Sequence, residues 1–292
     1  QMEFNKANLF VVGAMRSGTT SFVEVLQQHP SVYMSPIKEP HFFVTHLPKQ
    51  VYSPSRFFST EVYFEKKFPE PLHIAHILKK EHYNQLFSLA TNENYRCEAS
   101  TCYLHEKGAA TAIANYNPAA KIIIITRSPL ERAYSHYKMD KGLGRTTISF
   151  EEALQRELQA YKLGELPWYS YLNMSCYSKA IKRYEHLFKN VLVLSYEELY
   201  HSATIWDTLW TFLELPSMVL SAIPYKNASR SVKGQKLYAK LQNTIWKDYF
   251  SKFVGTSAKN ALFKSISYKG NVQLSLSNDV LLEVEKFFQK AD

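Results

Sequence analysis

The chain has 292 residues, of which 46% are hydrophobic and 21% charged, and its formal net charge is +9. This composition is too apolar for a disordered chain, and no apolar run approaches the roughly 20 residues that cross a bilayer. Three cysteines are too few for a disulfide framework. They favour a reducing, cytoplasmic setting, although a piece of a longer Golgi-lumenal protein would have the same composition.

The excess positive charge lies in one part of the chain. Residues 215–278 contain ten basic side chains and a single acidic one, so this segment carries the whole net charge. A segment of one sign indicates an anionic partner, such as a nucleotide, an acidic substrate or a nucleic acid. The alternative is a solvated basic face without a binding role.

Strands and helices are predicted to alternate along the chain. The apolar run 8–12 predicts a buried strand, and residues 20–28 predict a helix directly after it. The other predicted strands are 95–99, 121–126 and 191–195, and the other predicted helices are one that starts at 129 and those over 150–161, 170–188, 204–213, 236–250 and 278–289. This alternation predicts an α/β fold with a central parallel sheet flanked by helices. No linker interrupts the pattern, so we expect a single domain over residues 1–292.

Two of the predicted helices have clear start signals. Ser128 precedes Pro129, which predicts a helix start with Ser128 as the N-cap and Glu131 completing a capping box. Ser149 and Glu152 repeat this spacing before the next helix. Both signals therefore fix a boundary in the alternating pattern.

The segment between the first strand and the first helix, GAMRSGTT, has the composition of an anion-binding loop. Gly13 and Gly18 let backbone amides turn inward, and the helix start adds a partial positive charge. Arg16 supplies a cation, and two threonines supply hydroxyl donors. The G-x-x-x-x-G spacing is that of a phosphate loop, but Thr19 stands where nucleotide hydrolases carry a lysine. An ordinary tight turn is the alternative.

A cation follows the most β-branched strand of the chain. The isoleucine run 122–125 leads into Thr126 and Arg127. An ATP or GTP hydrolase needs a carboxylate near such a strand end to hold Mg²⁺. Arg127 would repel the metal ion and attract a phosphate. The sequence therefore predicts a site that binds an anionic nucleotide without the usual metal ligand.

These two segments together resemble a known family. GAMRSGTTS after an apolar strand, with IIIITRSPLERAYSHY later in the chain, resembles the two nucleotide-binding motifs of sulfotransferases that use 3′-phosphoadenosine 5′-phosphosulfate (PAPS). The resemblance covers residues 8–240. It is nearest to the carbohydrate branch and its bacterial relatives, which carry a segment similar to KEPHFF at 38–43. The resemblance implies a single P-loop-type domain.

The resemblance also implies which residues bind the donor and its product, 3′-phosphoadenosine 5′-phosphate (PAP). Arg16 would neutralise charge on the bridging oxygen as the sulfuryl group leaves, and no metal ion would be needed. The implied contacts are Arg16, Ser17, Gly18, Thr19 and Thr20 around the 5′-phosphosulfate, Arg127 and Ser135 on the 3′-phosphate, Tyr177 near the adenine, and Arg230, Lys233 and Gly234 in a loop that closes over the 3′-phosphate.

The KEPHFF segment supplies two candidate bases. A hydroxyl is a poor nucleophile near neutral pH, so a carboxylate or an imidazole must take its proton. Glu39 matches the catalytic glutamate of the glycan sulfotransferases. His41 is the competing base, because the pKa of an imidazole lies closer to neutral. For both residues an exposed turn is the alternative.

A third segment resembles the acceptor side of the glycan enzymes, where the pattern reads E-K-S/T-P-x-Y. Glu98, Ser100 and Tyr103 match this pattern, whereas Ala99 and Thr101 replace its lysine and proline. The three matching residues are candidate acceptor contacts. The missing lysine weakens any transfer of glycan specificity to this chain.

The leading hypothesis is therefore a sulfotransferase that moves a sulfuryl group from PAPS to an acceptor hydroxyl by in-line displacement. The acceptor would be a carbohydrate or another metabolite, and the basic segment favours an acidic one. A P-loop small-molecule kinase is the enzymatic alternative, and a nucleic-acid-binding module is the non-enzymatic one. We expect no nucleic-acid partner and no membrane span, and the sequence leaves the oligomeric state open.

Overall fold

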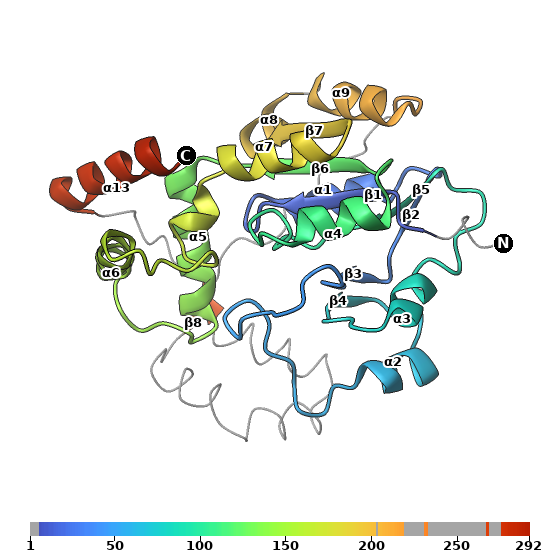
Figure 1. Cartoon of the computed structure of the whole chain (residues 1–292), viewed down its shortest axis with the longest axis horizontal. Helices are drawn as coiled ribbons and strands as arrows, with labels where there is room; N and C mark the ends of the chain where they lie inside the picture. The colour runs from blue at the N-terminus through green and yellow to red at the C-terminus, as the bar shows by residue number, and fades with distance from the viewer. Residues whose placement is uncertain (1–5, 203, 219–230, 233–266, 269–275) are drawn as a thin grey trace. The chain divides into compact units, whose positions relative to one another are not determined.

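The computed structural model describes residues 6–202, 204–218, 231–232, 267–268 and 276–292 (Figure 1). The described elements are, in chain order, β1 (Leu9–Gly13), α1 (Thr19–Leu26), β2 (Val32–Met34), β3 (Ile37–Glu39), α2 (Thr60–Lys66), β4 (Leu72–Ile74), α3 (Lys80–Gln85), β5 (Tyr95–Glu98), α4 (Ala109–Tyr116), β6 (Lys121–Thr126), α5 (Pro129–Gly142), α6 (Phe150–Lys162), the 3₁₀ helix η1 (Asn173–Ser175), α7 (Ser178–Leu187), β7 (Asn190–Ser195), α8 (Tyr196–His201), α9 (Thr204–Leu213), β8 (Ser231–Val232), β9 (Ser267–Tyr268) and α13 (Asn278–Ala291).

The described elements form two compact units. The first contains strands β1 to β7 with α1 to α4 and α7 to α9, and the second contains α5, α6, η1, β8, β9 and α13. The expected single domain over residues 1–292 stays a prediction. None of the described helices is long and apolar enough to cross a membrane.

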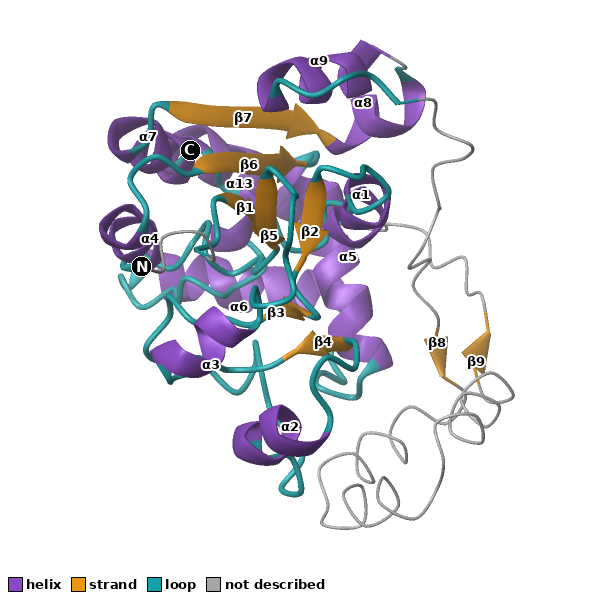
Figure 2. Ribbon diagram, turned by 90° about the vertical axis from the view of Figure 1, so that its right-hand side faces the viewer, coloured by secondary structure: helices purple, strands orange, loops and turns teal. Residues whose placement is uncertain are grey.

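A five-stranded sheet with the order β2-β5-β1-β6-β7 forms the centre of the first unit (Figure 2). Every neighbouring pair in it is parallel. In the centre, Leu9 of β1 lies opposite Cys97 of β5 on one side and Lys121 of β6 on the other. This topology confirms the predicted α/β class with a central parallel sheet. The predicted strands and the first helix agree with the observed ones to within two residues.

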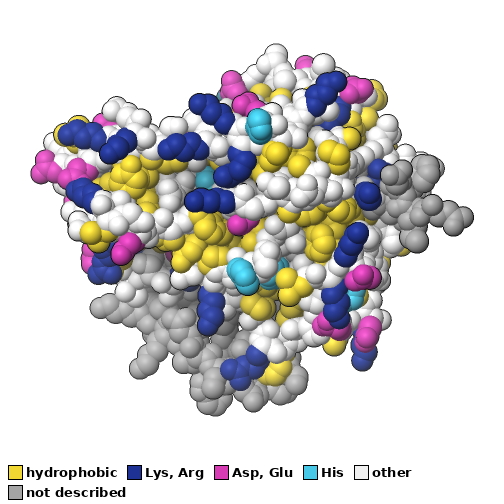
Figure 3. Space-filling model, viewed as in Figure 1, with side chains coloured by type: hydrophobic (Ala, Val, Ile, Leu, Met, Phe, Trp, Pro, Cys, Tyr) yellow, Lys and Arg dark blue, Asp and Glu magenta, His cyan; other side chains and the backbone are white. Residues whose placement is uncertain are grey.

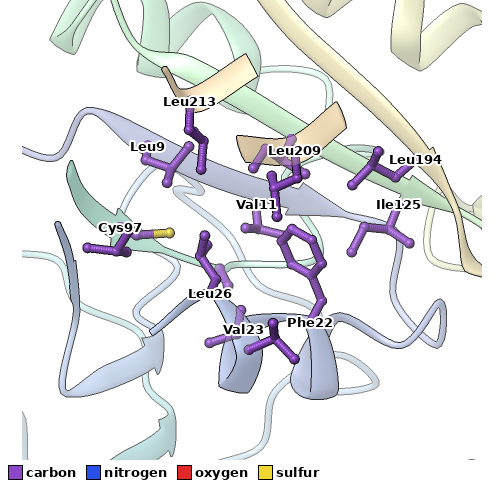
Figure 4. Packing of buried hydrophobic residues seen from close by; sticks show 14 of the residues in the cluster. Leu9, Val11, Phe22, Val23, Leu26, Cys97, Ile125, Leu194, Leu209 and Leu213 are labelled. Carbon is purple, nitrogen blue, oxygen red and sulfur yellow. The ribbon is translucent and has the colours of Figure 1, made fainter. Parts of the chain in front are cut away.

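One face of this sheet packs against α1 and α9. Strands that are covered on both faces read as continuous apolar runs, and all five residues of β1 are buried. Val11 and Ile125 face a cluster to which α1 contributes Phe22 and α9 contributes Leu209. Figure 4 shows these side chains converging between the two helices and the strands. The cluster anchors the helix that follows the anion-binding loop.

The opposite face of the sheet holds the segment that follows β3. The ring of Phe43 lies 5.8 Å from that of Phe10 on β1 and 5.2 Å from that of Tyr116 on α4. Phe43 is buried, because its ring packs between strand β1 and helix α4. The KEPHFF segment is therefore fixed at one end by packing on the central strand.

A second small sheet fixes the other end of that segment. β3 and β4 pair in parallel, with Ile37 opposite Leu72 and Glu39 opposite Ile74. The amide of Ala75 donates to the carbonyl oxygen of Glu39 at 3.0 Å. Glu39, the last residue of β3, thus has a rigid backbone.

Two predicted features of the second unit have different outcomes. The capping box of α6 is confirmed, because the Ser149 hydroxyl accepts from the amide of Glu152 at 3.1 Å. The predicted helix 170–188 is wrong in its first part, where the chain forms η1 before α7 begins at Ser178. There the Glu157 carboxylate accepts from the amides of Tyr171 and Leu172, each at 2.8 Å, so these bonds hold the segment against α6. The predicted helix 236–250 lies outside the described residues.

Candidate functional site

The anion-binding loop leaves the carboxyl end of the central strand β1 and enters α1. Arg16 and Gly18 have positive φ angles of 72° and 79°, so the backbone turns sharply twice within three residues. No side chain caps α1. The first amides of a helix have no acceptor within the helix, so those of Thr19 and Thr20 are placed to bind an anion.

Gly13 is required by a close approach of two backbone segments. A Cβ atom at this position would lie 2.7 Å from Cβ of Leu104 and 3.2 Å from the carbonyl oxygen of Thr101. The amide of Leu104 donates to the Val12 carbonyl at 2.8 Å, which holds the two segments together. The loop therefore leaves β1 pressed against the segment that follows β5.

Ser17 places an unsatisfied hydroxyl in this loop. Its side chain is fully buried, and its Oγ has no hydrogen-bond partner within the described part of the chain. A buried hydroxyl without a partner is costly, and such groups in native proteins call for an explanation. A bound anionic oxygen accepting from Ser17 would satisfy it. The unsatisfied hydroxyl of Ser17 therefore fits a loop that binds the phosphosulfate end of PAPS.

Arg127 meets the loop from the neighbouring strand β6. Its Nη1 donates to the carbonyl oxygen of Arg16 at 3.4 Å, and its guanidinium lies 4.5 Å from the ring centroid of Tyr196. The Tyr177 hydroxyl donates to the Arg127 carbonyl at 3.0 Å. The two predicted motifs and Tyr177 therefore lie together, at the carboxyl edge of the sheet where ligands bind in open α/β folds.

Glu197 is a residue that the sequence analysis missed. Its Oε1 accepts from the amide of Ser128 at 3.0 Å, so this amide is already engaged at the predicted capping box. Burial raises the pKa of Glu197, but the Ser128 amide, the Ser195 hydroxyl and Arg127 lower it below its usual value. The sequence does mark this helix start, because Ser195 and Glu198 have the spacing of a capping box at the end of a strand. In the structure the Ser195 hydroxyl accepts from the amide of Glu198.

Glu39 is buried in a shell of donors. Oε1 accepts from the Lys38 ammonium at 2.8 Å, and Oε2 accepts from the Thr101 hydroxyl at 3.0 Å and the Thr101 amide at 3.3 Å. Burial alone would raise the pKa of Glu39, but Lys38 and His41 hold it far below its usual value. The side chain is a carboxylate at neutral pH. An exposed turn, the alternative for this segment, is ruled out by its burial.

His41 stabilises that carboxylate. Its Nδ1 lies 3.1 Å from the carbonyl oxygen of Ala75, and its Nε2 lies 3.4 Å from Oε2 of Glu39. Both neighbours are acceptors, so both ring nitrogens keep a proton. Burial lowers the pKa of His41, but Cys102 and Glu39 raise it well above its usual value. An imidazolium cannot take a proton, so this geometry disfavours His41 as the base.

The candidate acceptor contacts Glu98, Ser100 and Tyr103 are fully buried. Glu98 accepts from the Ser100 hydroxyl at 2.7 Å and from the Tyr83 and Tyr103 hydroxyls at 3.0 Å each. Burial raises its pKa to about 7, although the three hydroxyls and His41 lower it. These side chains form an internal network instead of lining an open surface.

The network holds the KEPHFF segment. The Ser100 hydroxyl accepts from the His41 amide at 3.0 Å, and the Tyr103 hydroxyl accepts from the Phe43 amide at 3.3 Å. His41 has a positive φ of 51°, a conformation that non-glycine residues rarely adopt. Ser100 and Tyr103 thus position the segment that carries Glu39.

Four further residues were predicted to belong to the site. Ser135 is buried on α5, in the second unit. Arg230, Lys233 and Gly234 lie outside the described residues. Within the described ranges, no three His, Cys, Asp or Glu side chains are grouped closely enough to hold a metal ion.

Comparisons with known proteins agree with this fold. A family model described as the sulfotransferase family matches residues 8–216. No curated protein matches the chain significantly. A sulfotransferase from Alicyclobacillus acidocaldarius is 24% identical with a TM-score of 0.58, and the match covers 97% of this chain and 96% of that one. Mouse sulfotransferase SULT7A1, solved with PAP, is 16% identical with a TM-score of 0.51, covering 98% and 83%. The family predicted from the sequence is confirmed, and the carbohydrate branch stays a prediction.

Proposed function

Because the chain belongs to the sulfotransferase family, we propose that it transfers a sulfuryl group from PAPS to an acceptor hydroxyl. The observation that carries the proposal is the contact between the two nucleotide-binding motifs, in which Arg127 donates to the backbone of Arg16. The similar mouse enzyme was solved with PAP, the product of such a donor. An acidic carbohydrate is the acceptor class that we favour, since the net charge is +9.

The loop would hold the phosphosulfate end of the donor. The buried Ser17 hydroxyl has no partner in the described chain and no side chain caps the first amides of α1, so these donors suit anionic oxygens. Arg16 would neutralise the charge that develops on the bridging oxygen. Arg127 would bind the 3′-phosphate with its planar fork, an orientation supported by the ring of Tyr196 beneath it. We propose that Ser135, Arg230, Lys233 and Gly234 complete this phosphate site.

Glu39 would take the proton from the acceptor hydroxyl. Its partner Thr101 lies against Gly13, where the loop begins, and its partners keep it ionised at neutral pH. His41 would stabilise it.

Three free thiols are compatible with a reducing compartment, and we propose the cytoplasm as the location.

Calorimetric titration with PAP tests the donor site. Wild-type protein should bind PAP with a Kd in the micromolar range, and Arg16→Ala and Arg127→Ala should each weaken binding, because each removes a cation facing the ligand. Arg156→Ala, at an exposed arginine paired with Glu152, is the matched control and should bind normally. Equal PAP binding by all variants would contradict the proposal.

Turnover of sulfur-labelled PAPS distinguishes the enzymatic alternatives. With water as the acceptor, the protein should release labelled sulfate from PAPS, and Glu39→Gln should keep PAP binding while losing about 100-fold in rate. A P-loop kinase would instead turn over Mg-ATP. ATP turnover without PAPS turnover would reverse the assignment, and retained PAPS turnover in Glu39→Gln would remove this residue from its role.

A further inference from the structure

His73 lies beside Glu39 on the neighbouring strand β4. Its Nε2 is 3.9 Å from Oε1 of Glu39, and its side chain is 63% exposed. Its backbone is held by the ladder on both sides, because Leu72 pairs with Ile37 and Ile74 pairs with Glu39. Histidine side chains reach the surface on the face drawn in Figure 3. His73 thus joins the buried carboxylate to solvent.

The other neighbours of the Glu39 carboxylate can only donate hydrogen bonds to it. The Lys38 ammonium engages Oε1, and the amide and hydroxyl of Thr101 engage Oε2, which also faces the protonated ring of His41. None of these groups can accept a proton at neutral pH. Among these neighbours of Glu39 in the described part of the chain, His73 is the one group that combines an unprotonated ring nitrogen with exposure to water.

Burial and three nearby charged groups together set the pKa of His73 below its usual value. Lys38 and Glu39 come from β3, and His41 from the segment that follows it. Burial lowers the pKa of His73, Lys38 and His41 lower it further, and Glu39 raises it, with a net value below the usual one. At pH 7 the ring is therefore a base, and it is a better resting place for a proton than Glu39, whose pKa is far lower.

We propose that His73 is the terminal proton acceptor of the sulfuryl transfer, receiving through Glu39 the proton of the attacking hydroxyl. This inference rests on the proposed function. The acceptor O–H bond breaks and its oxygen bonds to sulfur, while the bond from sulfur to the 5′-phosphate oxygen breaks and leaves its electron pair on that oxygen. The proton passes to Glu39, then to Nε2 of His73, and finally to water.

The pH dependence of the chemical step tests this relay. Single-turnover cleavage of labelled PAPS, with water as the acceptor, should slow tenfold per pH unit below a midpoint under 6.5 in the wild type, as His73 becomes protonated. His73→Asn should lose this acidic limb and react about 10-fold more slowly at pH 7.5. Added imidazole should restore its rate, which a purely structural defect would not allow.

Two further measurements do not depend on turnover. In the wild type, the NMR titration of the His73 ring should have its midpoint below the usual pKa of an imidazole. Glu39→Gln should lower this midpoint, because the Glu39 charge raises the pKa of His73. His73→Asn should bind PAP as the wild type does. The matched control is His76→Asn, since the His76 ring bonds to the Val44 carbonyl at 2.7 Å instead.

An unchanged acidic limb in His73→Asn, or a rate that imidazole does not restore, would overturn the relay. A His76→Asn variant that reproduces all the effects of His73→Asn would overturn it as well. Failure of the proposed function has a different signature. In that case the wild type itself would neither bind PAP nor cleave PAPS, and the relay would fall with it.

Discussion

Glu39 and His41 stand two residues apart, yet their surroundings give them opposite charges at neutral pH. Lys38 and Thr101 donate to Glu39, whereas the ring nitrogens of His41 lie 3.1 Å from the Ala75 carbonyl oxygen and 3.4 Å from Oε2 of Glu39. Hydrogen-bond donors around a carboxyl group favour its ionised form, and acceptor oxygens around an imidazole favour its protonated form. The hydrogen-bond partners therefore support our proposal of Glu39, between the two candidate bases that the sequence left open.

Thr101 provides a direct test of this shell. Thr101→Val keeps the side-chain shape but removes the hydroxyl that donates to Glu39 at 3.0 Å. Hydrogen bonds to charged groups are worth about 1.5–3 kcal/mol, so we expect a loss of roughly that size in the free energy of unfolding at pH 7. Denaturant unfolding measures the loss, and Thr101→Ser should retain most of the stability. Equal effects of both substitutions would show that the hydroxyl is not the cause.

Glu98 should make the stability of the protein depend on pH. Burial raises its pKa from 4.5 to about 7, so between these values the folded protein keeps a proton that the unfolded chain has lost. The free energy of unfolding should therefore decrease as the pH rises from about 4.5 to about 7. In Glu98→Gln, which cannot ionise, this decrease should be smaller, as denaturant unfolding at several pH values would reveal. Glu65→Gln, at an exposed position, is the control and should leave the profile unchanged.

At the level of elements, the site is a set of strand ends. β1 leads into the anion-binding loop, β6 leads into Arg127, and β5 leads into the segment that holds Glu39. Because β1 lies between β5 and β6 in a parallel sheet, these three ends meet at one edge. The order of the strands, more than any single motif, brings the donor site and the candidate base together.

Gly13→Ala tests the closeness of two of these strand ends. The added Cβ would meet Leu104 at 2.7 Å, so one of the two segments must shift. Overpacking of this kind costs about 1–3 kcal/mol, and the shift should also weaken PAP binding, because the loop begins at Gly13. Thermal unfolding and PAP calorimetry measure the two effects. Gly108→Ala is the control, since its Cβ would meet only the flexible end of Glu106, and equal losses in both variants would contradict the argument.

At the level of the whole molecule, the net charge of +9 suits a polyanionic donor. A ligand that binds only the folded protein stabilises it by mass action, by about 2.7 kcal/mol at 100 times its Kd. We therefore expect PAP at that concentration to raise Tm by about 5 °C, as differential scanning fluorimetry would measure. The shift should shrink in Arg127→Ala, whereas an equal shift in this variant would place PAP elsewhere.

The sequence by itself determined the family, the parallel α/β sheet and the nucleotide-binding motifs. It could do so because an apolar run before a Gly-rich loop, and a β-branched run before Arg127, are local patterns that encode a strand end and its ligand contacts. It also predicted the capping box at Ser149 from spacing within a few residues, whereas the role of Glu39 stays a prediction. These features can be predicted from local sequence without knowing which distant segments contact one another in the fold.

Only the tertiary structure decided what surrounds these residues. Glu197 reaches Ser128 and Thr101 reaches Glu39 across 69 and 62 residues of chain, and His73 approaches Glu39 from a separate strand. The predicted helix start at 170 is wrong, and a distant carboxylate accepts from an amide of the segment that lies there. Burial, protonation and backbone amide partners depend on contacts between distant segments, and a linear pattern carries no record of those contacts.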